Sequence, residues 1–530
     1  MKRIFFRLLP LLLCLCLLCG CDGVFDVLSG GEEQDAPAVE NPQEEPEKGM
    51  ASESVLDEVQ TLDALRLAWQ PEYGLNPYET ASFCNRTVLS VLYEPLYTVN
   101  SQFAAEPVLA QSITYSEDGL TATVTLRQGV RFHNGSALTA RDVVYSYEQA
   151  KESAYYGPRF TRVTDFVSSG TYTVMITMDT TCESVGLLLD FPIIRSGTAG
   201  QAIPDGTGPF LPIHTGNTEN TTLVAFEKWW GEERPLGYDE LTLVACTTST
   251  DIRDHFEYGD VNLVCTDPNA AAYAPYHSDS DYELWSANTT VMQYLGFNHN
   301  HEVYANKDIC AAVTYLIDRD VIVAEDMGGF ALPATLPASP MSPYYDAGLA
   351  ADYAYDPETF HTKLEEAQVE DYTEDGILDV YYKGYPEPLA GRLIVSAANP
   401  QRVATANRIA ATLNAYGFDI TVTPLDPEEF RAAMSSGDYE LYYAETRLSA
   451  NFDLTPFFRA GGSLSYGGLE STTMENLCVG MLENSGNAYD LHKRIMDRGL
   501  FCPIAFKSYA IYTTRGTTGN LDPDIDWWLR

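Results

Sequence analysis

The chain has few basic residues. Lysine and arginine together number 32 against 75 aspartates and glutamates, which gives a formal net charge of -43 at pH 7. Proteins that hold nucleic acids through the phosphate backbone need clustered lysine and arginine. This composition therefore argues against a nucleic-acid partner. An acidic balance is typical of a soluble extracellular protein and would also suit a cationic ligand.

A membrane-spanning apolar run is missing as well. The apolar run Leu8–Leu18 has about half of the roughly 20 residues that a bilayer-crossing helix needs. It follows a positively charged start, an order that is typical of a secretory signal. The run ends in Leu18-Cys19-Gly20-Cys21, which resembles the lipobox of bacterial lipoproteins. This resemblance implies cleavage after Gly20 and lipidation of Cys21.

The segment after the leader is poor in aromatic and apolar residues. Residues 22–60 are rich in Gly, Glu, Pro and Ser, and such a composition cannot bury enough apolar area to fold. We therefore expect a signal peptide at 1–20, and the lipidated cysteine followed by a disordered acidic tether at 21–61. The folded body of roughly 470 residues is too long for one core, so we expect more than one lobe.

The sequence lacks a recognisable metal or catalytic motif. The cysteines beyond Cys21 are widely spaced and form no CxxC pair, and neither HExxH nor GxSxG occurs. His299, His301 and Glu302 are close in sequence, but no further ligands or supporting residues are evident. We therefore predict no metal site, no cofactor and no enzymatic activity.

Periodicity predicts several elements. Leu120 to Leu126 alternate between apolar and polar residues, as in a half-buried strand. Thr139 and Asp142 form a capping box that opens a helix, and 87–96 also has a helical pattern. The stretch 393–422 reads as strand, helix and strand, with Gly417 ending the helix, which is the size of one right-handed βαβ unit.

Two of these elements lie in a longer pattern at 110–150, AQSITYSEDGLTATVTLRQGVRFHNGSALTARDVVYSYEQA. Its Ser-x-Asp-Gly turn, Leu-Arg-x-Gly-Val-x-Phe-His-x-Gly run and Leu-Thr-Ala-x-Asp-Val run resemble the signature of the family 5 extracellular solute-binding proteins, the oligopeptide, dipeptide and nickel-binding group. Further landmarks follow in the family's order. They include Gly206-Thr207-Gly208-Pro209-Phe210, the segment 224–243 and the helix 311–323. The resemblance covers about residues 62–515.

The resemblance implies an α/β fold of the two-lobed periplasmic-binding-protein type, with mixed sheets and an extra third region (cluster C type). Lobe I would comprise 62–290 plus 505–530, with the extra subdomain at about 98–204. Lobe II would comprise 291–504. In such proteins two lobes close over a solute, because the ligand touches both lobes only in the closed state.

The implied function is capture of short peptides and their delivery to the permease and ATPase subunits of an ABC importer. The protein would be a monomer held by its lipid anchor at the outer face of the bacterial cytoplasmic membrane. Two alternatives stay open. The same scaffold could bind another solute, such as a metal chelate, a sugar or an amino-acid derivative, or it could act as a solute sensor without transport.

The resemblance also points to ligand-binding residues. Many members read Asp-Tyr-x-Asp-Pro after the strand that corresponds to 439–444, with an acidic residue that meets the ligand's ammonium group. This chain departs from that pattern, with Glu445 in the acidic position and Asp453 as the alternative. Arg447 would pair with Glu445 or meet a ligand carboxylate, and Asn451 lies between them; equally, the cluster could only order its own loop. By analogy, Glu72, Tyr73 and Trp285 also lie at the cleft.

Overall fold

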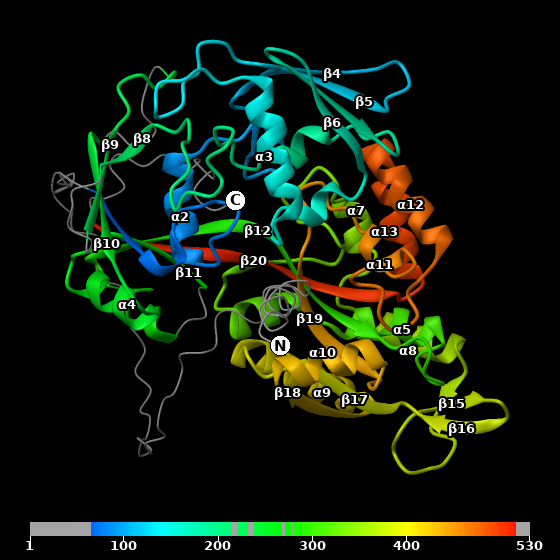
Figure 1. Ribbon diagram of the computed structural model, residues 1–530. Helices are drawn as coiled ribbons and strands as arrows, with labels where there is room; N and C mark the ends of the chain where they lie inside the picture. The colour runs from blue at the N-terminus through cyan, green and yellow to red at the C-terminus, as the bar shows by residue number, and fades with distance from the viewer. Residues whose placement is uncertain (1–64, 214–219, 232–237, 268–270, 278, 516–530) are drawn as a thin grey trace, which may run out of the picture.

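The computed structural model describes residues 65–213, 220–231, 238–267, 271–277 and 279–515. Within them, one mixed sheet runs through the molecule in the order β18-β17-β19-β12-β20-β11-β1-β10-β9-β8, and β13 pairs with β20 (Figure 1). Smaller sheets are β4-β5-β7-β6, β14-β15-β16 and β2-β3. The predicted leader, Cys21 and the tether lie outside the described residues.

The strands have the following bounds: β1 Leu65–Trp69, β2 Tyr97–Val99, β3 Ala105–Pro107, β4 Ala110–Tyr115, β5 Thr121–Leu126, β6 Val163–Gly170, β7 Thr173–Met178, β8 Phe210–Ile213, β9 Asn220–Ala225, β10 Glu240–Ala245, β11 Leu263–Thr266, β12 Tyr282–Phe297, β13 Ala331–Pro333, β14 Val369–Glu370, β15 Asp379–Tyr382, β16 Tyr385–Pro388, β17 Ala390–Ser396, β18 Asp419–Leu425, β19 Leu441–Arg447 and β20 Phe501–Thr514. The helices are α2 Phe83–Leu92, α3 Ala140–Glu152, α4 Ser249–Glu257, α5 Lys307–Val313, α6 Arg319–Val321, α7 Ala347–Ala351, α8 Pro357–Glu366, α9 Pro400–Ala415, α10 Pro427–Ser436, α11 Thr455–Phe458, α12 Thr472–Glu483 and α13 Ala488–Asp497. None of the helices in the described part is both long and apolar enough to cross a bilayer.

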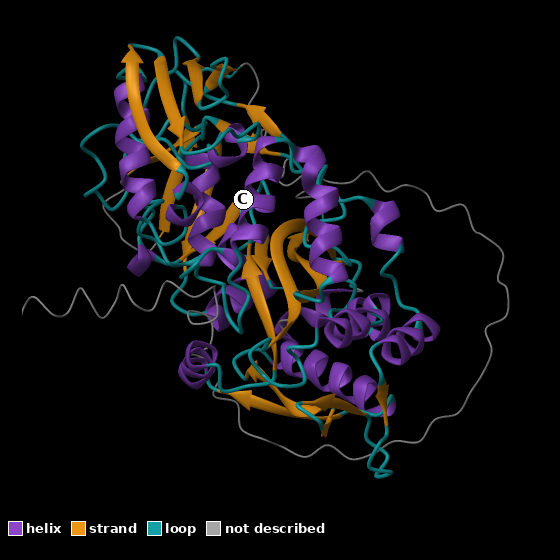
Figure 2. Cartoon of the chain, turned by 90° about the vertical axis from the view of Figure 1, so that its right-hand side faces the viewer, coloured by secondary structure: helices purple, strands orange, loops and turns teal. Residues whose placement is uncertain are grey.

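Two long strands connect the two halves of the main sheet. β12 and β20 run antiparallel to each other, and their register shifts between Asn288 and Met292 and again between Gln293 and Tyr294. On one side β20 pairs with β11, and on the other side β12 pairs with β19. The elements gather in two bodies, one above the other in Figure 2. A bulge bends a strand locally and increases its twist, so the sheet changes direction where these strands pass between the bodies.

The first half of the sheet, β11 to β8, packs against α2. Residues 87–96 were expected to be helical, but the helix instead begins after Ser82, whose side chain caps Asn85 N–H, and ends at Leu92. The prediction ran too far because Glu94 precedes a proline, which disfavours helical backbone. The predicted turn at 206–210 packs on this helix end: a Cβ on Gly206 would lie 2.0 Å from the Leu92 carbonyl oxygen. Glycine is required there by close backbone approach, so this motif is scaffold.

The second half of the sheet contains the predicted βαβ unit. β17 and β18 pair in parallel on either side of α9 in sequence, and Gly417 has a φ of 90° just after the helix. Asp426 and Glu429 form a capping box at α10. The strand side chains Leu393, Ile394 and Val395 are fully buried. The βαβ prediction is therefore confirmed.

Residues 98–204 contain the sheet β4-β5-β7-β6 and helix α3. The buried positions of β5 alternate as predicted, and the Thr139–Asp142 capping box is present at α3. This region also touches the second half of the chain: Phe103 stacks edge-on with Phe452 at 5.1 Å between ring centres, and the Thr180 hydroxyl donates to Glu483 at 3.1 Å. In Figure 1, α12 lies beside this region. The assignment of 98–204 to lobe I stays a prediction.

Candidate solute-binding site at the crossing strands

A buried lysine lies where the two long strands cross. Lys507, on β20, has a side chain that is only 6% exposed, and its ammonium lies 2.6 Å from Asp267 Oδ2 and 3.4 Å from Glu445 Oε2. Asp267 directly follows β11, whereas Glu445 belongs to β19, so the lysine joins acidic side chains from the two halves of the sheet. We call Asp267, Lys507 and Glu445 the ion chain. Lysine is almost never fully buried unless it is paired.

The carboxylate of Glu445 belongs to a wider polar network. Gln293 of β12 donates to Glu445 Oε2 at 2.8 Å, and the Tyr443 hydroxyl donates to Gln293 Oε1 at 2.7 Å. Gln293 Nε2 also lies 3.3 Å from Gln401 Oε1 in the first turn of α9. Both of these contacts reach Glu445 through Oε2, and the positive charge of Arg402 also acts on this carboxylate.

The charges around Glu445 keep it ionised. Burial by itself raises the pKa of this carboxyl group, but Lys507, Arg402 and the hydrogen bond from Gln293 outweigh that effect and lower the pKa to about 2. The two carboxylates have the converse influence on Lys507, whose pKa is raised despite its burial. Glu445 and Lys507 are thus both charged at neutral pH, and in a site of low dielectric their interaction is strong.

Arg447 lies two residues further along β19, and it contacts two tyrosines. Its guanidinium donates to the Tyr509 hydroxyl at 2.7 Å and lies over the ring of Tyr155, 5.6 Å from its centre. Tyr509 belongs to β20, while Tyr155 belongs to the 98–204 region. A guanidinium against two aromatic rings is stabilised by cation–π attraction.

The other predicted site residues have different settings. Asn451 is buried and accepts from the Ser449 hydroxyl at 2.6 Å, while Asp453 accepts from the backbone N–H and the hydroxyl of Thr455 at the start of α11. These bonds order their own loop. Glu72 and Tyr73 are exposed in a short turn after β1. Trp285 lies on β12 opposite Ile511, and its indole N–H is buried with no acceptor among the described residues.

His299 has a structural role in the described part of the chain. Both ring nitrogens of His299 contact backbone carbonyl oxygens, of Tyr304 at 2.9 Å and of Leu500 at 3.0 Å, and burial lowers the pKa of this histidine. An imidazole that is held on both sides has no nitrogen left to bind a metal ion. An open depression of about 750 Å³ lies elsewhere, over α9, and includes the Asp326–Arg408 ion pair.

The comparison with protein families adds a second line of argument. A model described as "Bacterial extracellular solute-binding proteins, family 5 Middle" matches residues 104–464, which is more than half of the 530-residue chain. The chain belongs to this family. The match includes the signature that starts at residue 110 and the site residues from Trp285 to Asp453.

Individual relatives have low sequence identity to this family 5 protein. A glutathione-binding protein, GsiB, of Salmonella paratyphi A is 26% identical over 311 residues, which cover 55% of this chain and 59% of that protein. Among solved structures, NikA of Brucella suis in complex with Fe(III)-EDTA has a TM-score of 0.67 at 20% identity, with 85% of this chain and 95% of that chain covered. The oligopeptide-binding protein AppA of Bacillus subtilis, in complex with a nonapeptide, has a TM-score of 0.59 at 20% identity, covering 86% and 95%. These likenesses confirm the predicted two-lobed α/β fold.

Sequence reasoning missed two of the three members of the ion chain of this family 5 protein, Asp267 and Lys507. Lys507 is the single basic residue in the strand FCPIAFKSYAIYTT, and a lysine amid apolar residues of a strand is a signal for a buried, paired charge. Asp267 and Gln293 carry no such signal. Their partners lie 240 and 152 residues away along the chain, so only the three-dimensional fold reveals them.

Proposed function

We propose that this chain captures a short peptide, or a similar solute with an ammonium group, between its two lobes. The proposal is supported by membership of a solute-binding family and by relatives that bind glutathione and a nonapeptide. It extends to delivery of the solute to permease and ATPase subunits of an ABC importer. It also includes anchoring of the monomer at the outer face of the cytoplasmic membrane through a lipid on Cys21.

The single observation that carries the proposal is the ion chain at the crossing strands. Glu445 is ionised, and it is hydrogen-bonded to Gln293 and ion-paired with Lys507. A ligand ammonium that contacts this carboxylate would gain a charge-assisted hydrogen bond. Because the ion chain joins β11, β20 and β19, such a ligand would interact with both halves of the sheet, which favours a closed arrangement.

Arg447 supplies the second half of the proposed recognition. A peptide carries an ammonium at one end and a carboxylate at the other, and Arg447 presents a guanidinium on the same strand as Glu445. Residues of equal parity on one strand face the same side of the sheet. Glu445 and Arg447 therefore offer opposite charges to one ligand.

The first experiment measures the melting temperature of the refolded chain with pools of short peptides, amino acids, sugars and metal chelates. Unfolding and refolding remove any solute that was bound during expression. A ligand at 100 times its dissociation constant stabilises the protein by about 2.7 kcal/mol. Stabilisation by peptides alone supports the proposal. Stabilisation only by sugars or chelates would keep the binding function and replace the solute class, and no response to any pool would favour a sensor for a specialised ligand.

A substitution then tests the contact. Glu445→Ala is expected to weaken binding of the identified peptide by about 1.5–3 kcal/mol, the range for a hydrogen bond to a charged group, measured by isothermal calorimetry. Glu475→Ala is the matched control. Glu475 lies on α12 and is ion-paired with Arg459, so its removal should leave the affinity for the peptide unchanged. Equal affinity for Glu445→Ala and the parent chain would remove Glu445 from the site.

A further inference from the structure

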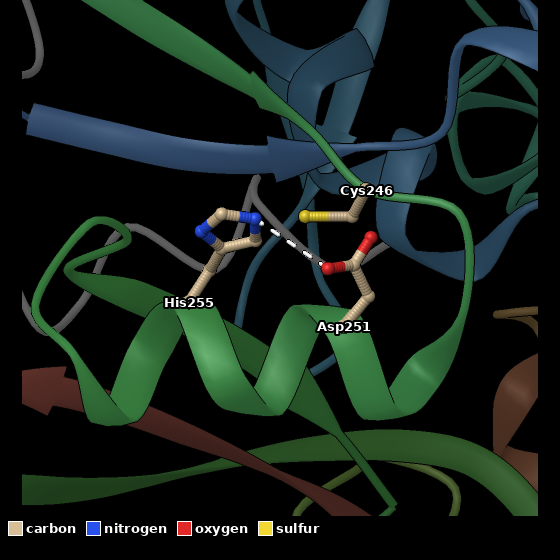
Figure 3. Close-up of side chains that lie close together, drawn as sticks. All are labelled: Cys246, Asp251 and His255. Carbon is tan, nitrogen blue, oxygen red and sulfur yellow. Dashed lines mark ion pairs between the residues drawn. The ribbon is translucent and has the colours of Figure 1, made fainter.

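Three side chains of different chemistry converge beside the first half of the main sheet. Cys246 directly follows β10, and Asp251 and His255 lie one turn apart on α4. One ligand atom from each, the thiol sulfur, a carboxylate oxygen and an imidazole nitrogen, lies within 4.8 Å of the other two. Figure 3 shows these three groups directed toward one another above the helix. Two ligands at positions i and i+4 of a helix face are a recurrent arrangement in zinc sites.

Neighbouring groups orient two of these side chains. His255 Nδ1 lies 3.1 Å from the Asp260 carboxylate, so Nδ1 carries the proton in that hydrogen bond and Nε2 faces Asp251 Oδ1 at 3.5 Å. Asp251 Oδ2 accepts from the backbone N–H of Thr247 at 2.8 Å, which leaves Oδ1 toward the imidazole. A carboxylate that holds the outer nitrogen of a histidine is typical of metal-binding histidines.

We propose that Cys246, Asp251 and His255 bind a divalent ion of the zinc class. Thiolate, imidazole and carboxylate are the ligands that zinc prefers, whereas calcium and magnesium prefer oxygen alone. Zinc bonds of about 2.0–2.2 Å to nitrogen and oxygen place those atoms roughly 3.3 Å apart in a tetrahedron, close to the 3.5 Å separation of Nε2 and Oδ1. Three protein ligands leave a fourth position for water or an exogenous group.

Charge and access are consistent with this site. The thiolate and the carboxylate together carry two negative charges, which a divalent ion neutralises. The metal ion would take the place of the proton on the buried thiol of Cys246, and that proton would be released to solvent. The side chains of Asp251 and His255 are about one-third exposed, which gives an ion a route to the buried sulfur and gives these ligands freedom to close on it.

Cobalt(II) is the probe for the experiment, because its spectrum reports its ligands. The purified, reduced full chain is titrated with Co²⁺ in metal-free buffer without any solute, so the outcome is independent of the proposed function. We expect one equivalent to bind, with a thiolate-to-cobalt charge-transfer band in the near ultraviolet and ligand-field bands of tetrahedral intensity. Zinc should displace the cobalt and abolish the bands.

Variants assign the site. Cys246→Ser should abolish the charge-transfer band, and His255→Gln should weaken Co²⁺ binding by tenfold or more. Asp260→Asn should weaken binding about tenfold, as for other residues that orient metal ligands. Asp254→Asn on the same helix is the matched control, since Asp254 pairs with Arg253 and should change nothing. His255→Gln keeps the test valid if the buried Cys246→Ser variant fails to fold.

Three outcomes would overturn the inference. One is the absence of a charge-transfer band in the reduced parent chain. The second is a band that survives Cys246→Ser, which would place the metal on other thiols. The third is an equal loss of affinity in Asp254→Asn and His255→Gln.

Discussion

Two contacts connect the halves of this molecule, and they differ in chemistry. The crossing contact, formed by Asp267, Lys507 and Glu445 on the long strands, is buried and charged. The side contact, formed by residues 98–204 against α11 and α12, joins Phe103 to Phe452 and Thr180 to the exposed Glu483. Parting the side contact returns Thr180 and Glu483 to water but also exposes the buried rings of Phe103 and Phe452, whereas disrupting the crossing contact removes the counter-charges of a buried lysine. We therefore expect the crossing contact to be the harder of the two to disrupt and the side contact to open first.

The largest expected effect is at the crossing contact. Lys507→Met removes the ammonium that pairs with Glu445 and Asp267, and removing one partner of a buried ion pair costs about 3–5 kcal/mol. Because Asp267 is 35% exposed, we expect the lower end, about 3 kcal/mol, in the free energy of unfolding measured in urea.

Two further variants separate charge from packing. Lys493→Met removes an exposed helix-surface pair with Asp497 and should cost less than about 0.5 kcal/mol. Adding Glu445→Gln to Lys507→Met should recover part of the loss, because it removes a buried negative charge that has lost its lysine partner. If Lys507→Met and Lys493→Met cost the same, the crossing contact is no stronger than a surface pair.

The second prediction concerns acid. The pKa of Glu445 is about 2 in the fold, below the value of about 4.3 in an unfolded chain. The stability that Glu445 contributes as an anion is therefore complete above pH 4.3 and is lost as the pH falls toward 2. The difference in unfolding free energy between the parent chain and Glu445→Gln should be constant from pH 7 to 6 and shrink from pH 5 to 3. A constant difference over the whole range would contradict the lowered pKa.

How far the sequence predicts the fold depends on how local the signal is. The βαβ unit and the Thr139–Asp142 capping box were predictable because hydrophobic period, caps and Gly417 act within a few residues. The start and end of α2 were misjudged because side-chain capping by Ser82 and the backbone ahead of Pro95 compete with a continuing apolar pattern. Element boundaries depend on such local competition.

The candidate site was harder to predict than the fold. The position after the expected strand 439–444 pointed to Glu445, which lies on β19. Its partner Lys507 lies on the last strand, and the other partner of Lys507, Asp267, follows β11. The Cys246–Asp251–His255 cluster was missed, because its cysteine follows a strand and its other members lie on a helix, so only the packing of these elements brings the three together. Such sites arise from packing between elements, so sequence spacing alone does not reveal them.

The smallest expected effect, at the side contact, bears most directly on the comparison. Thr180→Val keeps the shape and removes a hydrogen bond to Glu483, whose carboxylate remains hydrated, so the expected cost is only about 0.5 kcal/mol. The Glu183 N–H, which donates to the Leu482 carbonyl across the same contact at 3.1 Å, is the probe. If the side contact opens on its own, hydrogen exchange of this amide should accelerate about twofold in Thr180→Val, while the amide of Gln293 on β12 stays unchanged. Equal acceleration at both amides would mean that the two contacts open as one cooperative unit, and then the side contact could not separate while the crossing contact holds.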